Sequence, residues 1–89
     1  MTKSNRRSGD PFMALADPTR RQVLEMLRER GMRTAGEIAA AFPHISRPGV
    51  SRHLRVLRES GLVIAEEAGR ERQYRLNVAA LARMHRDWF

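Results

Sequence analysis

The stretch HISRPGVSRHLRVLRESGLV, residues 44–63, decides the fold, because it carries the start, both faces and the end of one helix. Ser46 is the predicted N-cap, since its hydroxyl can accept a hydrogen bond from an amide of the first turn. Pro48 lies in that turn, where its missing amide proton has no helical partner to lose. Gly61 is the predicted end, because glycine readily adopts the left-handed conformation that closes a helix.

This helix has an apolar face and a basic face. Val50, Leu54 and Leu57 recur at helical spacing and would be buried, with His53 beside them. Outward or flanking positions carry hydroxyl and basic side chains: Arg47, Ser51, Arg52, Arg55 and, near the edge, Arg58. A basic face is often only a solvated face, but an ordinary surface helix mixes both signs of charge, and here only Glu59 is acidic. The pattern favours a helix that enters the major groove of DNA.

The composition favours the same kind of partner. The 89 residues include 17 lysines and arginines against 10 acidic residues, and this net charge of +7 favours a polyanion, nucleic acid before membrane. The absence of cysteine excludes disulfides, thiolate metal sites and cysteine nucleophiles. No apolar run approaches the roughly 20 residues that span a bilayer, so we expect a cytoplasmic protein without a membrane partner.

The chain divides into a tail and one folded domain. Residues 1–9 are polar and basic and are predicted to be a flexible tail, with a basic arm in the DNA minor groove as the alternative. Residues 10–89 are predicted to form the domain. Its core would be small, so oligomerisation would add stability.

Two aspartate–proline pairs predict helix starts upstream of the basic helix. The pair at residues 10–11 opens a short helix through residue 16, and the pair at residues 17–18 opens a second helix that ends before Gly31. The apolar stripe of the first helix consists of Phe12, Leu15 and Ala16, and the second helix is predicted to turn Val23, Leu24 and Leu27 inward.

A third helix lies close enough to the basic one to form a helix-turn-helix. Thr34 and Glu37 fit a capping box, in which each side chain accepts a hydrogen bond from the other residue's amide. The helical stripe that follows consists of Ala35, Ile38, Ala39 and Phe42. Pro43 would end this helix, and the short gap before Ser46 leaves room only for a turn.

After Gly61 the apolar spacing changes from helical to alternating. Residues 62–67 and 72–76 are predicted strands joined by a turn at residues 68–71, where a glycine can supply a positive φ. Tyr74 and the leucine two residues later would share the inner face of this hairpin. A hairpin directly after a recognition helix is the wing of a winged helix.

The wing carries charges of both signs near its tip. Arg70 and Arg72 can reach a phosphate or a minor groove from there. Glu66, Glu67 and Glu71 argue against a wing that faces DNA over its whole length.

The last predicted helix spans residues 78–89, with Asn77 as its cap. Its apolar stripe is wider than a terminal helix of a small domain needs. Packing against the first helix can cover part of it, but a subunit interface is the sharper interpretation. The predicted interface residues are Phe12, Leu15, Leu81, Met84, His85 and Trp88.

The order of these elements, and the residues themselves, resemble the ArsR/SmtB family of bacterial transcriptional repressors. The matching motifs are ALADPTRR at residues 14–21, EIA at 37–39, VSRHL at 50–54, LRESGLV at 57–63 and YRL at 74–76. The resemblance extends from Phe12 to about Trp88. It implies a mainly α fold with a small β-hairpin, a winged helix-turn-helix of order α-α-α-α-β-β-α.

The resemblance also implies function. A member of this family would be a homodimer, joined by its first and last helices, that binds an inverted-repeat operator in double-stranded DNA. The DNA contacts it implies come from the start of the recognition helix: Ser46, Arg47, Pro48, Ser51 and Arg52. Gly49 departs from what a helix favours, at a cost of about 1 kcal/mol against alanine, and we expect close approach to DNA to offset this.

Metal-responsive members use cysteines near the recognition helix, or Asp and His pairs on the last helix. This chain has no cysteine, and His85 and Asp87 lie two residues apart, so they do not share a helical face. The chain therefore resembles the cysteine-free autorepressors, and we expect neither a metal nor a cofactor.

Two other functions fit the sequence less well. A winged-helix module that binds protein or RNA would favour exposed aromatic residues on the recognition face, and that face carries arginine and serine instead. An enzyme is not expected, because the sequence has no paired-carboxylate, nucleophile–base or glycine-rich phosphate motif.

Overall fold

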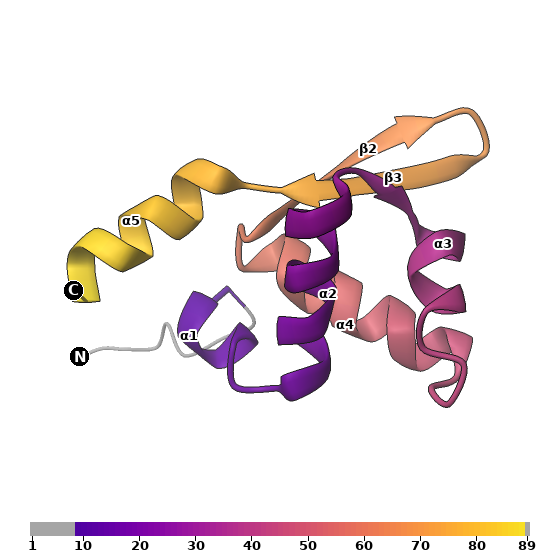
Figure 1. Cartoon of the computed structure of the whole chain (residues 1–89), viewed down its shortest axis with the longest axis horizontal. Helices are drawn as coiled ribbons and strands as arrows, with labels where there is room; N and C mark the ends of the chain where they lie inside the picture. Colours follow the sequence, from indigo (N-terminus) through magenta and orange to yellow (C-terminus); the bar gives the residue numbers. More distant parts are fainter. Residues whose placement is uncertain (1–8, 89) are drawn as a thin grey trace.

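The computed structural model of this chain describes residues 9–88, apart from the side chain of Trp88, and packs helices against a small antiparallel sheet (Figure 1). The predictions for residues 1–8, for the Trp88 side chain and for Phe89 lie outside the described residues. The helices are α1 (Pro11–Ala14), α2 (Pro18–Arg30), α3 (Ala35–Ala40), α4 (Arg47–Glu59) and α5 (Val78–Trp88). The strands are β1 (Arg33–Thr34), β2 (Val63–Ala68) and β3 (Glu71–Leu76).

Local capping interactions confirm the predicted helix starts. The Asp17 carboxylate accepts a hydrogen bond from the Arg20 amide at 3.0 Å, at the start of α2. The capping box of α3 is complete, because Thr34 Oγ1 accepts from the Glu37 amide at 3.1 Å and Glu37 Oε1 accepts from the Thr34 amide at 2.8 Å. These caps satisfy amides that have no partner within the helix.

Helix α1 is shorter than predicted, and the residues of its predicted apolar stripe differ in burial. The helix ends at Ala14, which is fully buried, whereas Phe12 is 42% exposed, Ala16 is exposed and only Leu15 packs partly against the core. The early end follows from the hydrogen bonding, because the Ala16 amide donates to the Met13 carbonyl at 3.1 Å, three residues back, rather than continuing the α-helical pattern. A helix of one turn can bury only one narrow face.

The hairpin forms with a tighter turn than predicted. β2 and β3 pair in register from Val63 opposite Leu76 to Ala68 opposite Glu71, and Gly69, with φ 67°, lies in the turn between them. Strand β1, which the sequence analysis did not predict, pairs with β3 to give the order β1-β3-β2. A strand as short as β1 has too few residues to show an alternating pattern.

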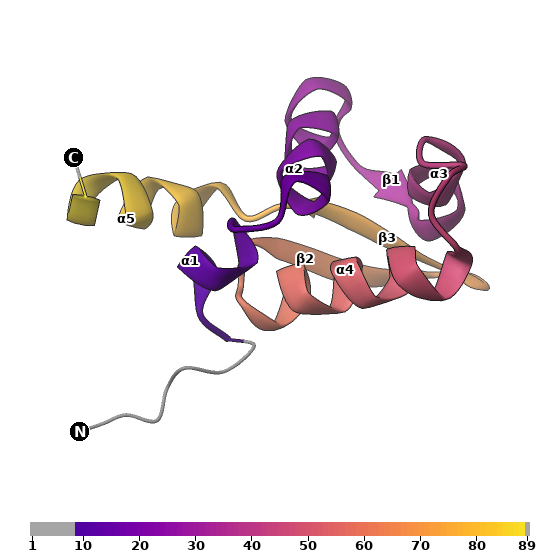
Figure 2. The same ribbon diagram turned by 90° about the horizontal axis from the view of Figure 1, so that it is seen from below.

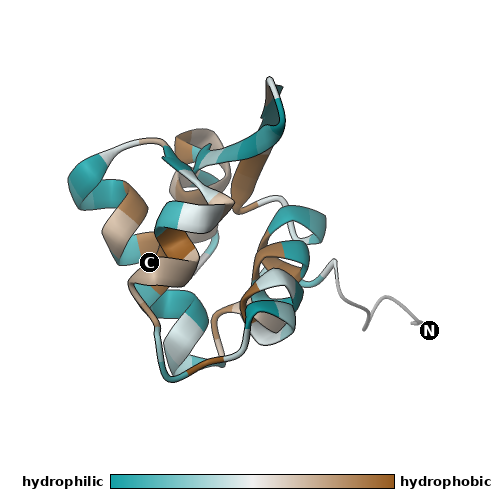
Figure 3. Ribbon diagram, turned by 90° about the vertical axis from the view of Figure 1, so that its right-hand side faces the viewer, coloured by the Kyte–Doolittle hydropathy of each residue, from teal (hydrophilic) through white to brown (hydrophobic). Residues whose placement is uncertain are grey.

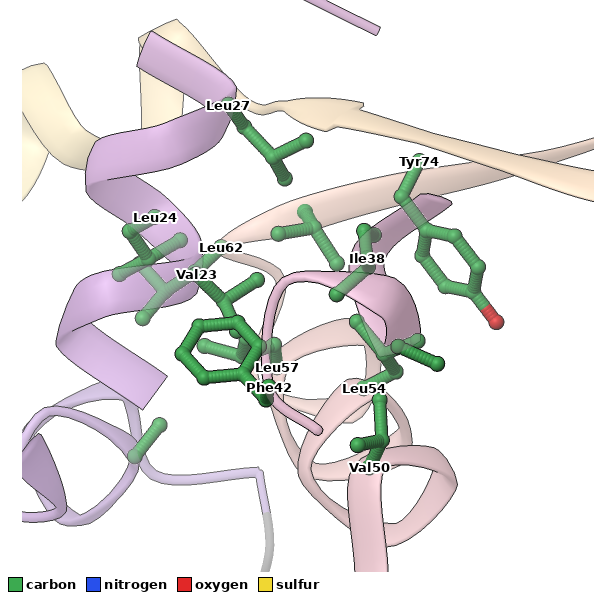
Figure 4. Close-up of a cluster of buried hydrophobic side chains, with 13 residues drawn as sticks. Val23, Leu24, Leu27, Ile38, Phe42, Val50, Leu54, Leu57, Leu62 and Tyr74 are labelled. Atoms are coloured by element: carbon green, nitrogen blue, oxygen red, sulfur yellow. The ribbon is translucent and has the colours of Figure 1, made fainter. Parts of the chain in front are cut away.

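The core lies where α2, α3 and α4 meet the sheet (Figures 2 and 4). Helices α2 and α3 contact β3, and α4 contacts α2, α3 and β2. Most residues predicted to face inward are buried there: Val23, Leu24, Leu27, Ile38, Ala39, Phe42, Val50, Leu54 and Leu57. Gly61, with φ 83°, ends α4 as predicted.

Helix α5 begins at the predicted cap and extends away from α2, α3 and α4 (Figure 1). The Asn77 side chain accepts from the Ala80 amide at 3.2 Å and donates to the Gly61 carbonyl at 2.9 Å, which ties α5 to the end of α4. The apolar residues of α5 differ in how far they are buried. Leu81 packs partly against the core, whereas Val78 is 69% exposed.

The Asp17 carboxylate is more than a helix cap. Burial alone would raise its pKa, but the hydrogen bond from the Arg20 amide and the charges of His53 and Arg20 outweigh burial and lower it below 3.8. The carboxylate lies 3.9 Å from His53 Nδ1, so it also faces the recognition helix.

Replacing Asp17 with alanine should lower the free energy of unfolding by about 1 kcal/mol at neutral pH, because the cap is lost. A carboxylate with a depressed folded-state pKa stabilises the fold above its unfolded pKa and loses that stabilisation as pH falls through the folded value. The difference between wild type and Asp17→Ala in urea unfolding should therefore shrink below pH 3.8. Asp17→Asn keeps a good cap and is the control. A difference that does not change on acidification would contradict this account.

Candidate nucleic-acid interface

The start of α4 presents polar and basic side chains to solvent. Ser46 caps the helix as predicted, with its hydroxyl accepting from the Gly49 amide at 3.1 Å, and this leaves the hydroxyl proton available as a donor. Arg47 and Pro48, in the first turn, are exposed. A helix N-terminus that carries basic side chains favours anions such as phosphate.

The hairpin runs beside α4 (Figure 2). A groove of about 450 Å³ lies between the outward face of α4 and this hairpin. Its lining residues are Pro48, Ser51, Arg52, Arg55, Arg58, Arg72 and Tyr74. The structure thus brings Pro48, Ser51, Arg52, Arg55 and Arg72 together, as members of the predicted DNA-contacting set. Ser46 and Arg47 lie at the start of α4 instead, and Arg70 lies in the hairpin turn.

The groove is strongly cationic. The charged side chains that line it are arginines from α4 and β3, and Arg52 and Arg55 are exposed to solvent. Arginines gathered around a concave surface concentrate positive potential there. Guanidinium groups bind phosphate and the guanine edge with two parallel hydrogen bonds, so the groove suits a nucleic acid.

The hairpin arginines are partly neutralised. Arg72 donates from Nε and Nη2 to Glu67 Oε2 at 3.3 and 3.2 Å, and these hydrogen bonds, with the charge of Glu67, raise the pKa of Arg72. Arg75 pairs with Glu66 at 3.3 Å on the opposite face of the hairpin. A guanidinium has five N–H donors, so Arg72 can hold Glu67 and still donate to a phosphate.

Tyr74 and Arg58 line the groove although the sequence analysis did not assign them to the interface. Tyr74 is only 7% exposed, and its ring closes the edge of the core while its hydroxyl points away from the other labelled side chains (Figure 4). Alternation along β3 was the available signal, because Tyr74 shares a face with Arg72 as well as with Leu76. The hairpin accordingly changes from hydrophobic at its base to hydrophilic towards its tip (Figure 3).

The predicted dimer residues gather around α1 and α5. Phe12 and Met84 line one cleft of about 240 Å³ between these helices, and Leu15 and Leu81 line a second of about 220 Å³. His85 is exposed on α5. Helices α1 and α5 therefore lie close together, and Leu15, Leu81 and Met84 are half-buried against the core of their own chain, so the dimer interface stays a prediction.

Within residues 9–88 there is no group of three or more His, Asp or Glu side chains placed to hold a metal ion, and the prediction of a metal-independent protein stays a prediction. None of the helices in this part of the chain is long and apolar enough to cross a membrane.

Comparison with known proteins gives consistent matches. A family described as "Helix-turn-helix domain" matches residues 15–66. The HTH-type transcriptional regulator Rv2034 of Mycobacterium tuberculosis is 44% identical over 76 residues, covering 85% of this chain and 69% of that protein. The transcriptional repressor SdpR of Bacillus subtilis is 40% identical over 70 residues, covering 79% and 76%.

A solved structure resembles the fold as well. It is the homodimeric winged helix-turn-helix DNA-binding domain Mb0332 (fragment 1–100) of Mycobacterium bovis, a possible ArsR-family transcriptional regulator. This chain superposes on it with a TM-score of 0.71 at 28% identity, over 94% of this chain and 82% of that one.

Gly49 has a structural reason within the chain itself. A Cβ at this position would lie 2.9 Å from Ile45 Cγ2 and 3.2 Å from Ser46 Oγ, closer than side chains tolerate. Close approach to Ile45 and the capping serine therefore accounts for this glycine within the chain, and close approach to DNA stays a prediction. The β-branched Ile45 side chain is stiff and cannot easily move aside.

Gly49→Ala should therefore not stabilise the protein, although alanine in place of an unhindered helical glycine gains about 1 kcal/mol. The matched control is Gly36→Ala in α3, where a Cβ would meet Glu71 and Thr34 only at 3.8 and 3.9 Å. Urea unfolding should show a gain for Gly36→Ala and a loss for Gly49→Ala. Equal gains would mean that Ile45 adjusts freely.

Proposed function

We propose that this chain, which belongs to the ArsR family of winged helix-turn-helix transcriptional regulators, represses transcription as a homodimer bound to an inverted-repeat operator. The observation that carries the proposal is the arginine-lined groove between α4 and the hairpin. A recognition helix and a wing that flank a cationic groove suit the major groove of B-DNA and the backbone beside it.

Each side chain has a proposed role in DNA binding. Arg52, exposed one turn into α4, reads guanine through O6 and N7, and Ser51 holds a phosphate or a base edge beside it. Phosphate contacts come from the start of α4, the groove and the wing, through Ser46, Arg47, Arg55, Arg70 and Arg72. Pro48 packs against the DNA backbone without donating a hydrogen bond. Phosphate contacts fix the position of the protein, whereas base contacts select the sequence.

Dimerisation through α1 and α5 is the second part of the proposal. Phe12, Met13 and Val78 are large apolar side chains that remain exposed on these helices in the single chain. A partner subunit would cover them around a two-fold axis, and two-fold symmetry matches an inverted repeat.

An operator that overlaps a promoter makes the bound protein a repressor, and it is an autorepressor where that promoter drives its own gene. Binding to chromosomal DNA would place the protein in the cytoplasm. Footprinting on DNA upstream of its own coding sequence tests both, and protection of an inverted repeat is the expected result. Binding that does not distinguish this DNA from a scrambled duplex would contradict the proposal. A module for protein or RNA is the less favoured alternative, because the relatives are named transcriptional regulators.

Arg52→Ala and Arg70→Ala should have different effects on DNA binding. Losing a two-bond guanine contact should reduce operator affinity by about 1–3 kcal/mol per half-site and reduce the preference for operator over scrambled DNA. Losing the Arg70 phosphate contact should weaken binding to all sequences alike and lower the salt slope by about one per subunit. Titrations of operator and scrambled duplexes at several salt concentrations measure both effects. If Arg52→Ala weakens both duplexes equally, Arg52 contacts the backbone rather than a base.

Phe12→Glu should convert the dimer to monomers and weaken operator binding, because a charge would be buried at the subunit interface. The folded single chain should tolerate it, since Phe12 is 42% exposed. Met32→Glu is the control, because Met32 is a similarly exposed apolar residue, at 39%, outside α1 and α5. Sedimentation equilibrium at micromolar concentration gives the mass, and a wild-type mass of one chain would contradict the dimer.

A further inference from the structure

The Asp17–Arg21 segment of the sequence has a role that DNA contact does not explain. The Arg20 guanidinium joins α1, α2 and α4: Nε donates to the Ala14 carbonyl at 2.7 Å and Nη2 donates to the Met13 carbonyl at 3.2 Å. Its Nη1 lies 3.3 Å from His53 Nδ1 on the recognition helix. One side chain of α2 therefore contacts both the end of α1 and the middle of α4.

The neighbouring arginine makes only the first of these connections. Arg21 Nη1 donates to the Leu15 carbonyl at 2.7 Å. Both arginines thus donate to carbonyls at the end of α1, where the last carbonyls of a helix lack partners within it. The Met13 carbonyl also accepts from the Ala16 amide at 3.1 Å. In contrast to Arg21, Arg20 also reaches α4, and this difference makes Arg21 a matched control for Arg20.

His53 holds the α4 end of this connection. Its side chain is 20% exposed, and it follows Arg52, the proposed base-reading residue, directly in the sequence. A guanidinium can only donate, so Nδ1 is the acceptor in this contact. Asp17 Oδ2 lies 3.9 Å from the same nitrogen, so the ring faces Asp17 and Arg20 of α2 together.

We propose that Arg20 is a positioning residue that fixes the angle between α1 and α4, and so sets the half-site spacing that the dimer accepts. The inference rests on the proposed function, in which α1 lies at the two-fold axis and α4 lies in the major groove. If α1 is held by the partner subunit, the distance between the two recognition helices depends on how rigidly each α1 is joined to its own α4. Figure 2 shows α1 between the N-terminal part of α2 and the C-terminal half of α4, where such a connection acts.

Half-site spacing is a sensitive measure of this rigidity. Inserting one base pair between half-sites moves one of them by roughly 3.4 Å and rotates it by roughly 35° about the DNA axis. A rigid dimer must lose contacts on such an operator, whereas a dimer with loosened recognition helices can adapt to it.

The test uses the full chain. Wild type first selects inverted-repeat duplexes from a random-sequence pool, and each selected duplex is then remade with one base pair inserted or removed at its centre. Wild type should lose affinity steeply on the altered spacings. Arg20→Ala should lose most of this discrimination while its affinity for a duplex with a single half-site changes little. Arg21→Ala should keep the wild-type spacing preference, because it does not contact α4.

His53 provides an independent arm of the test, which also applies if Arg20→Ala fails to give a cooperative melting transition. His53→Leu removes the acceptor and should broaden the spacing preference as Arg20→Ala does, whereas His53→Asn offers an oxygen near the position of Nδ1 and should retain it. In the double variant Arg20→Ala with His53→Leu, the effects should not add, because both remove the same contact.

The possible failures are distinct. If wild type selects no inverted repeat, the proposed function is wrong, and this inference falls with it. If wild type selects one, and Arg20→Ala and His53→Leu bind more weakly with an unchanged spacing preference, the arginine has only a structural role and the inference alone is overturned.

Discussion

The fold depends above all on burial of the apolar face of α4. Val50, Leu54 and Leu57 are at most 3% exposed, and they contact the core formed by α2, α3 and the sheet. Burying a side chain of this size stabilises the fold by about 1.5–3 kcal/mol, whereas an exposed ion pair contributes about 0–1 kcal/mol. Apolar burial therefore fixes the rotation of α4 about its axis, and the arginines on its other face point into the groove as a consequence.

The hairpin adds a second constraint, because its acidic side chains offset part of the positive charge that attracts any DNA. On the face towards α4, side chains change from Leu76 in the core, through Tyr74 at its edge, to Arg72 at the groove. Glu67 compensates part of the Arg72 charge. Every uncompensated cation strengthens binding to any DNA through counterion release, so in the proposed complex this pairing would limit the sequence-independent share of the affinity and leave discrimination to α4.

Features encoded within a few residues could be predicted, and features that depend on distant contacts could not. The caps at Asp17 and Ser46 and the buried stripe of α4 are local patterns, and the structure confirms them. Strand β1 exists only because β3 pairs with it, and Tyr74 lines the groove only because the hairpin folds beside α4. The contacts of Gly49 and Arg20 could not be predicted for the same reason. No rule of sequence spacing indicates that Gly49 lies against Ile45 or that Arg20 reaches His53. Helical periodicity predicted which α4 side chains face outward towards the groove, but it could not predict that Tyr74 of the hairpin lines the same groove.

The connection through Arg20 makes dimerisation and DNA binding thermodynamically dependent on each other. Helix α1 offers Phe12 to the proposed partner and its last carbonyls to Arg20, which contacts α4 through His53. If the dimer orders α1 and α1 orders α4, DNA meets recognition helices that are already positioned, and less conformational entropy is lost on binding. Coupling between two binding equilibria is reciprocal, so an operator must strengthen the dimer by the same factor by which the dimer strengthens operator binding. A small chain with a marginal core can in this way be a stable dimer mainly where its operator is present.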